Sequence, residues 1–586
     1  MKKKKLACMF SVILAASTLL TACGSQPSEK ETIDKVSETV TTTLDNENVT
    51  NSKYPEYLNL DSAYPVVKDE YADKITLSVA ILMQDNASEW DDLWISQYLK
   101  EKYNINLEVD YLTSANVEER KSLMLNTGEL PDLMINLSMS TSDIMKYGAE
   151  EGLFLQMDQY MDDTLTPNIL KKLSGSARDV CTAQDGHIYT LPWVLNQLND
   201  NNFKRIHINR KWLNDLGLEM PRTLDEFINA MYAIKEADPA NVGSENLYPF
   251  GSGDKMGYGN GWYILNALGY VEGTNISGDG YGILPALRDG EVVIPVYDMD
   301  VYQEYLKIMN QFYTDGIINP TFFTMEEIEM NAQMVEGKTA VYHNAPFVSG
   351  ITNTQDWESL YPLTSNWQTE PEIAGPGYAT PGNFLIYADT EYPELCLRFA
   401  ELFFNNDTDI ASMFQDGPYD GSEWCLGYPG RVYNEERKNS DWGEFPKGIE
   451  NGWQYQVECL FGNIWMFGAA ATDEGRTKYC AEMGYEFIPT QKGTWTDSNY
   501  FSNSVYTNME PYVVESFPTI YYLTAEQSEK MKELTTVITP YVEEQVAAFI
   551  TGRRPLSETD KFAEELKGLG IEEMLNIYKT VYETLK

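Results

Sequence analysis

Four tryptophans lie in stretches rich in Gly, Asn and Asp that lack the periodicity of a core element. They are Trp193, close to Asn196, and Trp262, Trp424 and Trp465. A pyranose has a flat C–H face and a rim of hydroxyls, so a sugar site needs aromatic rings beside planar hydrogen-bonding groups. We therefore expect these rings to stack on a sugar. The alternative for each ring is that it packs under a loop as part of the core.

Side chains with amide or carboxylate groups would fix the orientation of such a ligand. Asp85, Asn136, Asn196 and Asn344 are the expected partners for hydroxyl groups. A neutral sugar has no charge to pair, so these groups act as hydrogen-bonding partners while the rings supply most of the affinity.

The sequence gives little support for catalysis or for a bound cofactor. The chain has 89 acidic residues, so pairs of carboxylates for glycoside hydrolysis are unavoidable and carry no information. It lacks the G-x-S-x-G pattern, a complete dinucleotide fingerprint and a phosphate loop. Its three histidines are far apart, and the five cysteines after residue 23 show no zinc spacing. We predict no catalytic residues, no cofactor, no metal site and buried free thiols.

The elements that would position these residues are clearest in the first third of the chain. Alternating apolar residues predict strands at 75–81, 105–111 and 133–137, and helical spacing predicts helices at 90–98 and 117–126, the second ending near Gly128. This order predicts an α/β lobe with a mainly parallel sheet. Ligands of such sheets bind at the carboxyl ends of strands, which is where Asp85 and Asn136 are expected.

A second lobe is predicted to begin after residue 200. Thr223 and Glu226 form a capping-box pattern before an amphipathic helix, and another helix over 302–313 is stopped by Gly316. The C-terminal region is strongly helical. Ser557 and Asp560 are expected to cap one helix there, and a stripe of apolar residues marks the last helix over 571–585.

The N-terminus has the order of a secretory signal. Four lysines precede an apolar run that ends in Leu20-Thr-Ala-Cys23, and this end resembles the bacterial lipobox. We expect residues 1–22 to be a signal peptide and Cys23 to carry the lipid anchor; the alternative is a secreted protein with a chance cysteine. Residues 23–56 are polar and are expected to form a flexible tether.

The charge of the chain excludes one class of partner. With 43 basic and 89 acidic residues, the formal net charge is −46. Such a field repels nucleic acid, so we expect no nucleic-acid partner. The charge itself does not identify a ligand.

Four motifs occur in the order seen in one protein family. They are Leu125-Asn-Thr-Gly-Glu-Leu-Pro-Asp132, Asp185-Gly-His-Ile-Tyr-Thr-Leu-Pro192, Asn209-Arg-Lys-Trp-Leu-Asn-Asp-Leu-Gly-Leu218 and Phe549-Ile-Thr-Gly552. In these motifs the chain resembles family 1 extracellular solute-binding proteins, specifically the long lipoproteins of carbohydrate ABC importers in Gram-positive bacteria.

The resemblance implies a bilobal α/β fold of the type II periplasmic-binding-protein kind, with a hinge between the lobes and a helical C-terminal region. Lobe one would take residues 57–200 and 355–408, and lobe two would take residues 201–354 and 409–586. The loop after the first strand, the loop after Asp132 and the segment Tyr342–Phe347 resemble positions that line the sugar cleft of related proteins.

The resemblance also implies a function and a location. The chain would be a monomer on the outer face of the cytoplasmic membrane, where it binds an oligosaccharide and delivers it to ABC permease subunits. A glycoside hydrolase, a surface adhesion or sensor protein, and a binder of peptides or other polar solutes remain alternatives. Relatives often carry a calcium loop where this chain has Asp238-Pro-Ala-Asn-Val-Gly243, and Ala240 and Val242 replace expected ligands.

Overall fold

A computed structural model describes most of the chain beyond residue 52. The described residues are 53–62, 64–194, 205–251, 261–273, 279–343, 346–351, 353–375, 379–404 and 500–585, with short stretches between 424 and 469. Contacts divide the chain into Met1–Lys53 and Tyr54–Lys586. The predicted signal peptide, the anchor Cys23 and most of the tether therefore lie outside the described residues. Tyr54 already packs on the first core and donates a hydrogen bond to Asp162 (2.7 Å).

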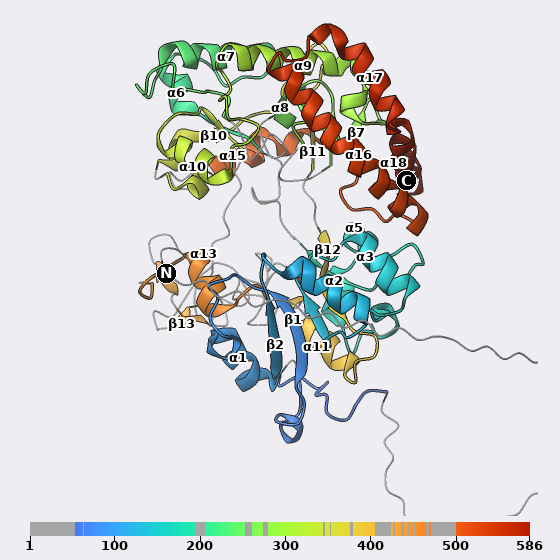
Figure 1. Ribbon diagram of the computed structural model, residues 1–586. Coiled ribbons are helices and arrows are strands. Elements are labelled where there is room, and N and C mark those ends of the chain that lie inside the picture. Colours follow the sequence, from blue (N-terminus) through green and yellow to red (C-terminus); the bar gives the residue numbers. More distant parts are fainter. Residues whose placement is uncertain are drawn as a thin grey trace, which may run out of the picture. The chain divides into compact units, whose positions relative to one another are not determined.

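The first lobe is built on a six-stranded sheet in the order β17-β4-β12-β3-β1-β2. Figure 1 labels three of these strands, β1, β2 and β12. β1 pairs in parallel with both β2 and β3, and β12 runs antiparallel between β3 and β4. The predicted β-α-β order is confirmed. The strands are β1 (Leu77–Leu82), β2 (Leu107–Leu112), β3 (Leu133–Ile135), β4 (Leu191–Val194), β12 (Ala379–Ile386) and β17 (Gly468–Ala469).

Helices cover both faces of this sheet because the side chains of each strand alternate between two cores. Val79 and Ile81 pack with α1, α4 and α11 in one core, whereas Ala80 packs with α2 and η3 in the other. The helical elements of this lobe are α1 (Trp94–Tyr103), α2 (Val117–Thr127), α3 (Thr141–Asp143), η3 (Ile144–Glu150), α4 (Pro167–Lys172), α5 (Ser176–Asp179), α11 (Pro393–Phe404), α13 (Gly452–Tyr455) and η9 (Gln456–Leu460).

The predicted end of α2 is also confirmed. Gly128 follows the helix with φ 71°, and its N–H donates to the carbonyl of Met124. Glycine adopts this left-handed conformation without the steric cost that a Cβ brings. Two short hairpins, β13–β14 (Trp424–Cys425 with Tyr428–Pro429) and β15–β16 (Arg431–Asn434 with Asn439–Trp442), follow later in the chain.

The second lobe is mainly helical, and its core is a separate cluster of apolar side chains. In Figure 1, α9 and the C-terminal helices α16, α17 and α18 lie side by side, and these helices contact one another. The helices of this lobe are α6 (Arg210–Asp215), α7 (Leu224–Ala237), α8 (Gly261–Ala267), α9 (Met299–Thr314), α10 (Glu327–Val335), α15 (Tyr500–Asn508), α16 (Ala525–Ile550), α17 (Thr559–Gly568) and α18 (Ile571–Leu585).

Three small sheets complete the second lobe. They have the orders β10-β5-β9, β6-β7-β8 and β11-β18. Their strands are β5 (His207–Asn209), β6 (Val271–Glu272), β7 (Ala286–Arg288), β8 (Glu291–Val293), β9 (Val341–Tyr342), β10 (Trp357–Ser359), β11 (Ile373–Ala374) and β18 (Val513–Val514).

The capping predictions for this lobe have different outcomes. The capping box of α7 is confirmed, since the Thr223 hydroxyl accepts from the N–H of Glu226 (3.2 Å) and the Glu226 carboxylate accepts from the N–H of Thr223 (3.1 Å). The predicted cap at Ser557 is wrong. Residues Leu556–Glu558 form a 3-10 turn, and α17 begins after Glu558 without a side-chain cap.

The chain crosses between the two cores at positions that differ from the predicted boundaries. Residues from 357 to 374 pack with the second core, because β10 pairs with β5 and Leu360 and Leu363 are buried there. The first core resumes at Ala379 and takes in α11, Phe461 and Ile464. The return to the first lobe therefore comes after residue 374 rather than at 355, and it extends beyond residue 408.

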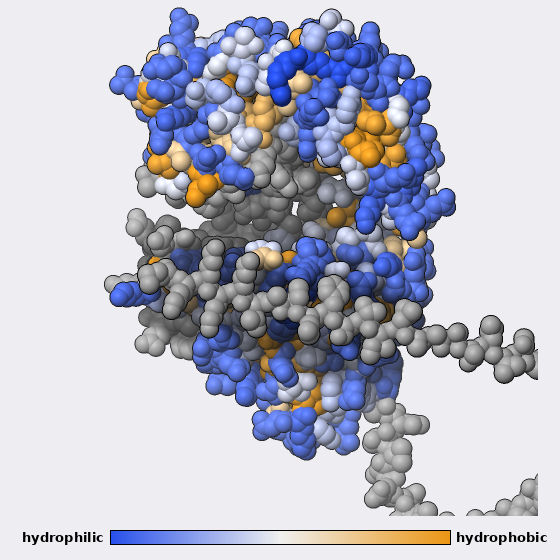
Figure 2. Space-filling model, viewed as in Figure 1, coloured by the Kyte–Doolittle hydropathy of each residue, from blue (hydrophilic) through white to orange (hydrophobic). Residues whose placement is uncertain are grey.

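On the face drawn in Figure 2, the described surface is mostly hydrophilic, and apolar residues gather in small separate patches. Within the described ranges, every helix is too short or too polar to cross a bilayer. Cys181 and Cys396 are buried free thiols and Cys459 is a half-buried one, as predicted; Cys425 and Cys480 contribute no described side chain.

Gly382 provides a test of the packing of β12. It sits at the irregularity between Thr380 and Phe384 with φ 81°, and an added Cβ would lie 2.1 Å from the carbonyl oxygen of Met139. We expect Gly382→Ala to lower the free energy of unfolding by about 2 kcal/mol or more, through both backbone strain and overlap. Urea denaturation measures this loss.

Gly152→Ala is the matched control. Gly152 has a similar φ of 70°, but nothing lies within 4 Å of an added Cβ. Only the conformational cost of about 1 kcal/mol should appear in this variant. Equal losses in the two variants would contradict the close contact at Met139.

Candidate ligand-binding site

The carboxyl ends of five strands meet at one edge of the six-stranded sheet. β1, β2 and β3 are parallel, β4 and β3 both run antiparallel to β12, and β17 is parallel to β4. β1 pairs with β2 on one side and β3 on the other, so the connections that follow β1 and β3 diverge at this edge. Such a switch point leaves a crevice, and ligands of open α/β sheets bind there.

Two buried asparagines connect the segments at this switch point. Asn136 follows β3 with φ 56°, and its N–H donates to the carbonyl of Asn383 (2.8 Å). Its side-chain amide donates to the carbonyl of Asn463, and the amide of Asn463 donates to the carbonyl of Leu82 at the end of β1 (2.9 Å). The side-chain oxygens of Asn136 and Asn463 are buried without a hydrogen-bond partner among the described residues. Two amide acceptors are therefore held at the switch point.

The structure brings three of the predicted residues to this sheet edge. Asp85 is exposed in the turn after β1, and Asn136 directly follows β3. Trp193 is partly exposed on β4, where it pairs with Thr380 of β12 and Gly468 of β17. An aromatic ring, an amide and a carboxylate therefore share the carboxyl edge of one sheet.

The other predicted residues are placed differently. Trp262 is the second residue of α8 in the second lobe, is 2% exposed and packs edge-on against Tyr263, as expected for a ring that is part of the core. Phe347 lies in the turn Pro346–Ser349, and Trp424 lies in β13. Asn196, Asn344 and Trp465 lie outside the described residues. Sequence reasoning missed Asn463, because its link to Leu82 spans 381 positions and has no local signal.

A cavity of about 500 Å³ opens beside this edge. This volume lies within the range of roughly 300 to 1,000 Å³ that is typical of ligand pockets. Hydroxyl side chains dominate its first-lobe wall, and the segment before α16 forms the opposite wall. The cavity is lined by Ser138–Ser142, Thr380, Pro381, Asn383, Thr519–Tyr521, Leu523 and Ser528. The only sequence signal for this wall is the run of Ser and Thr after the third predicted strand.

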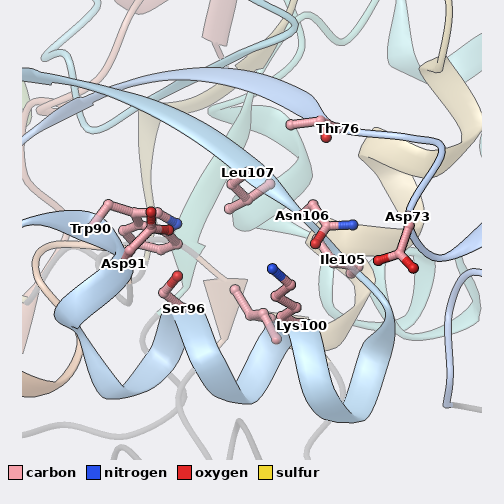
Figure 3. Close-up of a pocket in the computed structure, with 10 residues that line it drawn as sticks. Asp73, Thr76, Trp90, Asp91, Ser96, Lys100, Ile105, Asn106 and Leu107 are labelled. Atoms are coloured by element: carbon pink, nitrogen blue, oxygen red, sulfur yellow. The ribbon is translucent and has the colours of Figure 1, made fainter.

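A second cavity of the first lobe lies at the wrong end of the strands for this role. It has a volume of about 320 Å³, and its lining includes Thr76, which precedes β1, and Asn106, which precedes β2. Figure 3 shows Lys100 extending from α1 with its amine directed into the space between Trp90 and Asn106. The cavity is therefore near the amino ends of β1 and β2, away from the switch point.

The segment of the second lobe that was predicted to line the cleft begins at β9. Tyr342 pairs with His207 of β5, and His343 follows directly. Burial and, secondarily, the nearby Arg205 guanidinium lower the pKa of His343 to about 4. The imidazole is therefore neutral at physiological pH.

The loop that replaces the expected calcium loop is closed by the chain's own hydrogen bonds. The carboxylate of Asp238 accepts from the N–H groups of Val242 (3.0 Å) and Gly243 (2.8 Å). Within the described ranges, no three His, Cys, Asp or Glu side chains gather as a metal site would require.

Comparisons with known proteins found one matching family model and several similar proteins. The family model for bacterial extracellular solute-binding proteins matches residues 80–409. The fructooligosaccharide ABC transporter substrate-binding protein FusA of Streptococcus pneumoniae is 23% identical over 485 residues, which cover 79% of this chain and 82% of that protein. Lipoprotein LipO of Bacillus subtilis is 26% identical over 246 residues, which cover 41% of this chain and 44% of LipO.

Solved structures share the fold. FusA of S. pneumoniae in complex with kestose has a TM-score of 0.65 at 20% identity and covers 87% of this chain and 99% of its own. An extracellular solute-binding protein from Bifidobacterium longum subsp. infantis has a TM-score of 0.68 at 18% identity, covering 87% and 98%. The predicted bilobal α/β fold is confirmed.

The neutral His343 predicts a pH dependence of stability. Its pKa is about 4 in the folded chain and 6.5 in an unfolded chain, so between these values the unfolded state binds more protons. We expect the free energy of unfolding to fall as the pH is lowered from 6.5 toward 4, by up to about 3 kcal/mol from this group. His343→Gln should remove this slope, as measured by urea denaturation across pH.

His187→Gln is the matched control because its pKa is shifted in the opposite direction. A hydrogen bond with Asp158 (2.9 Å) raises the pKa of His187. The stability that His187 contributes is complete below its unfolded pKa and is lost as the pH rises through the folded pKa. This variant should keep the slope between pH 4 and 6.5. A wild-type slope in His343→Gln would refute the assignment to His343.

Proposed function

The chain belongs to the bacterial extracellular solute-binding protein family, and from this premise we propose that it is the substrate-binding component of an ABC importer for an oligosaccharide. The observation that carries this proposal is the switch point of the first lobe, where Asp85, Asn136 and Trp193 share one sheet edge. The name of FusA supports the ligand class, since that relative binds fructooligosaccharides.

The chemistry of this edge favours a neutral sugar. A partly exposed indole ring can stack on the C–H face of a pyranose or furanose, and the amide and hydroxyl groups can bond with its rim. Asn136 and Asn463 supply acceptors, and the hydroxyl groups of Ser138–Ser142 both donate and accept. The acidic chain, with a net charge of −46, disfavours an anionic ligand.

The segment before α16 supports a hinge. Tyr521 and Leu523 pack against the second core, whereas Tyr522 packs against the first. The Tyr522 hydroxyl donates to the carbonyl of Val180 (3.0 Å), and the amide of Gln184 donates to the carbonyl of Tyr522 (3.0 Å). A ligand that contacts both lobes would stabilise a closed arrangement around such a segment.

The N-terminus provides the proposed location. Cys23 would carry lipid at the outer face of the cytoplasmic membrane, and the polar residues that follow would tether the folded part to it. We propose that a monomer delivers its ligand there to the permease subunits of a Gram-positive cell. We also propose as ligand contacts the remaining residues that the sequence predicts, which are Asn196, Asn344, Phe347, Trp424 and Trp465.

The proposal also assigns the chain no catalytic role. A glycoside hydrolase acting on the same sugars is the competing function, and it requires two carboxyl groups on either side of the scissile bond. At the switch point, Asp85 follows β1, and the residues around Asn136 carry mainly amides and hydroxyls. The nearby carboxylates of Glu458 and Asp143 already accept hydrogen bonds from Asn86 and Ser140. This composition favours binding of a sugar over its cleavage.

Trp193 is the residue to test first. Losing one stacked face costs about 1 to 3 kcal/mol, so Trp193→Ala should weaken binding roughly five- to hundredfold, and Trp193→Phe should restore part of the loss. Titration calorimetry with a panel of neutral oligosaccharides that includes kestose measures the affinity. Added salt should change it little, because screening acts on charge pairs.

Two results would count against this picture. Unchanged affinity in a folded Trp193→Ala variant would remove Trp193 from the site, and a steep loss of affinity with salt would indicate a charged ligand. Chromatography of the sugar after the titration provides the further control. Release of shortened sugars would support the hydrolase instead.

The anchor gives a separate prediction. In the native host, the wild-type chain should be found in the membrane fraction with a mature N-terminus at Cys23, because acyl chains hold it there. Cys23→Ala should leave the precursor uncleaved or release it from the membrane. Fractionation and mass spectrometry check this. Cys8→Ala is the matched control and should not change the location, since Cys8 lies within the predicted signal.

A further inference from the structure

A further cavity, distinct from the two described above, lies wholly within the second lobe and has the features of a sugar site. It has a volume of about 560 Å³ and is bounded by the hairpin β7–β8, the loop before β11 and the end of β18. None of its lining residues belongs to the sheet edge described above. Seven of them carry functional groups that matter to the argument: Arg288, Trp367, Gln368 and the carboxylates of Asp289, Glu370, Glu372 and Glu515.

Trp367 presents an aromatic ring at this cavity. It is 42% exposed, which is unusual for a large apolar side chain in this protein. The turn that holds it is well fixed. The hydroxyl of Ser365 accepts from the N–H groups of Trp367 (3.0 Å) and Gln368 (3.3 Å) and donates to the carbonyl of Ala267 (2.6 Å). A ring on a fixed turn loses little freedom when it stacks on a ligand.

Gln368 adds a buried polar group next to this ring. Its side chain lines the cavity and is only 6% exposed, yet both its amide nitrogen and its amide oxygen lack a partner among the described residues. A buried amide without hydrogen bonds destabilises the protein, because the group has lost its bonds to water without replacing them. An amide group can both donate to and accept from sugar hydroxyls.

The charges around the cavity restrict the ligand class. Arg288 is the one cation among the lining residues, and its guanidinium is already paired with Asp298 (2.9 Å). Asp289, Glu370, Glu372 and Glu515 also line the cavity, so carboxylates exceed cations there. An anionic ligand such as a uronate would be repelled. Carboxylates bind neutral hydroxyl groups well, because they accept hydrogen bonds strongly.

We propose that this cavity is a second carbohydrate-binding site, which takes a residue of a neutral glycan with its C–H face on Trp367 and its hydroxyls on Gln368 and the surrounding carboxylates. The site is separate from the switch point of the first lobe and does not require it. It would retain a long glycan at the protein surface independently of the ligand that the importer takes up.

The test uses ¹⁹F NMR on the mature chain labelled with 5-fluorotryptophan. The chain has 12 tryptophans, and the resonance that disappears in Trp367→Phe identifies Trp367. The probes are kestose, maltotriose, xylotriose and mannotriose at about 10 mM, a concentration that detects weak millimolar sites. We expect at least one neutral probe to shift the Trp367 resonance saturably, and trigalacturonate at the same concentration to leave it in place. An unmoved resonance with all four neutral sugars, or an equal shift with trigalacturonate, would overturn the proposal.

Gln368→Leu separates binding from folding. Its side chain makes no hydrogen bond to the described residues, so an apolar side chain of similar size should leave the melting temperature unchanged or raise it. The same change should lower the affinity for the sugar that shifts the Trp367 resonance by about tenfold or more. Full retention of that affinity would contradict the role of Gln368 and with it the site.

Trp193→Ala serves as the independent background. The shift of Trp367 should persist in that variant, because the two rings belong to different lobes. If Trp193→Ala no longer binds a sugar at the switch point but the Trp367 shift persists, the substitution bears only on the switch-point site. The second site is then intact. Loss of the Trp367 shift in Trp193→Ala would show that the two sites are one, which overturns the inference.

Discussion

The pairing of β1 with a strand on each side is the constraint on which the first lobe and its site depend. Asp132 supports this pairing, because its carboxylate accepts hydrogen bonds from the N–H (2.8 Å) and hydroxyl (2.7 Å) of Ser78 on β1. Its other oxygen accepts from Thr390, which connects β12 to α11. Asp132 ends the motif Leu125–Asp132, one of the four on which the resemblance of the sequence depends, and its contacts give that motif a structural role. With β1 and β3 fixed in register, Asn136 is fixed at the switch point.

The predictions that succeeded were those with a local signal. Each of these signals spans no more than about a dozen neighbouring residues. They are the alternation along β1, β2 and β3, the glycine at the end of α2 and the capping box of α7. The boundaries of the lobes failed for the opposite reason. β10 has three residues, too few to show a period, and its contacts with distant elements such as β5 and α15 assign it to the second lobe. Ser557 matched a capping pattern, yet it lies inside a 3-10 turn that follows Pro555, and α17 begins one residue later than that pattern predicts.

Three tryptophans show what a sequence leaves open about a site. Trp193, Trp262 and Trp367 all lie close to polar residues or glycines in the sequence, yet Trp262 is buried in the second core whereas Trp367 is exposed beside a cavity. Local composition says that a ring is not part of a periodic core stripe. It does not say whether another element covers that ring, because the covering residues come from distant parts of the chain. The same limit applies to Asn463, whose partner Leu82 is placed by tertiary contacts alone.

The segment from Thr519 to Leu523 links the site to any movement of the lobes. It forms one wall of the cavity at the switch point, and its neighbouring tyrosines pack on different cores. A rotation between the lobes has two possible effects on this segment. Either the hydrogen bonds of Tyr522 with Val180 and Gln184 change, or they persist and the chain bends where it packs on the second core. Because a ligand shifts such an equilibrium only by its differential affinity for the two arrangements, contacts to this wall matter for closure in a way that contacts to Asn136 alone do not. Ser140 and Tyr521 lie on opposite walls of this cavity. A sugar that contacts both of them is therefore the kind of ligand that can drive closure of the lobes.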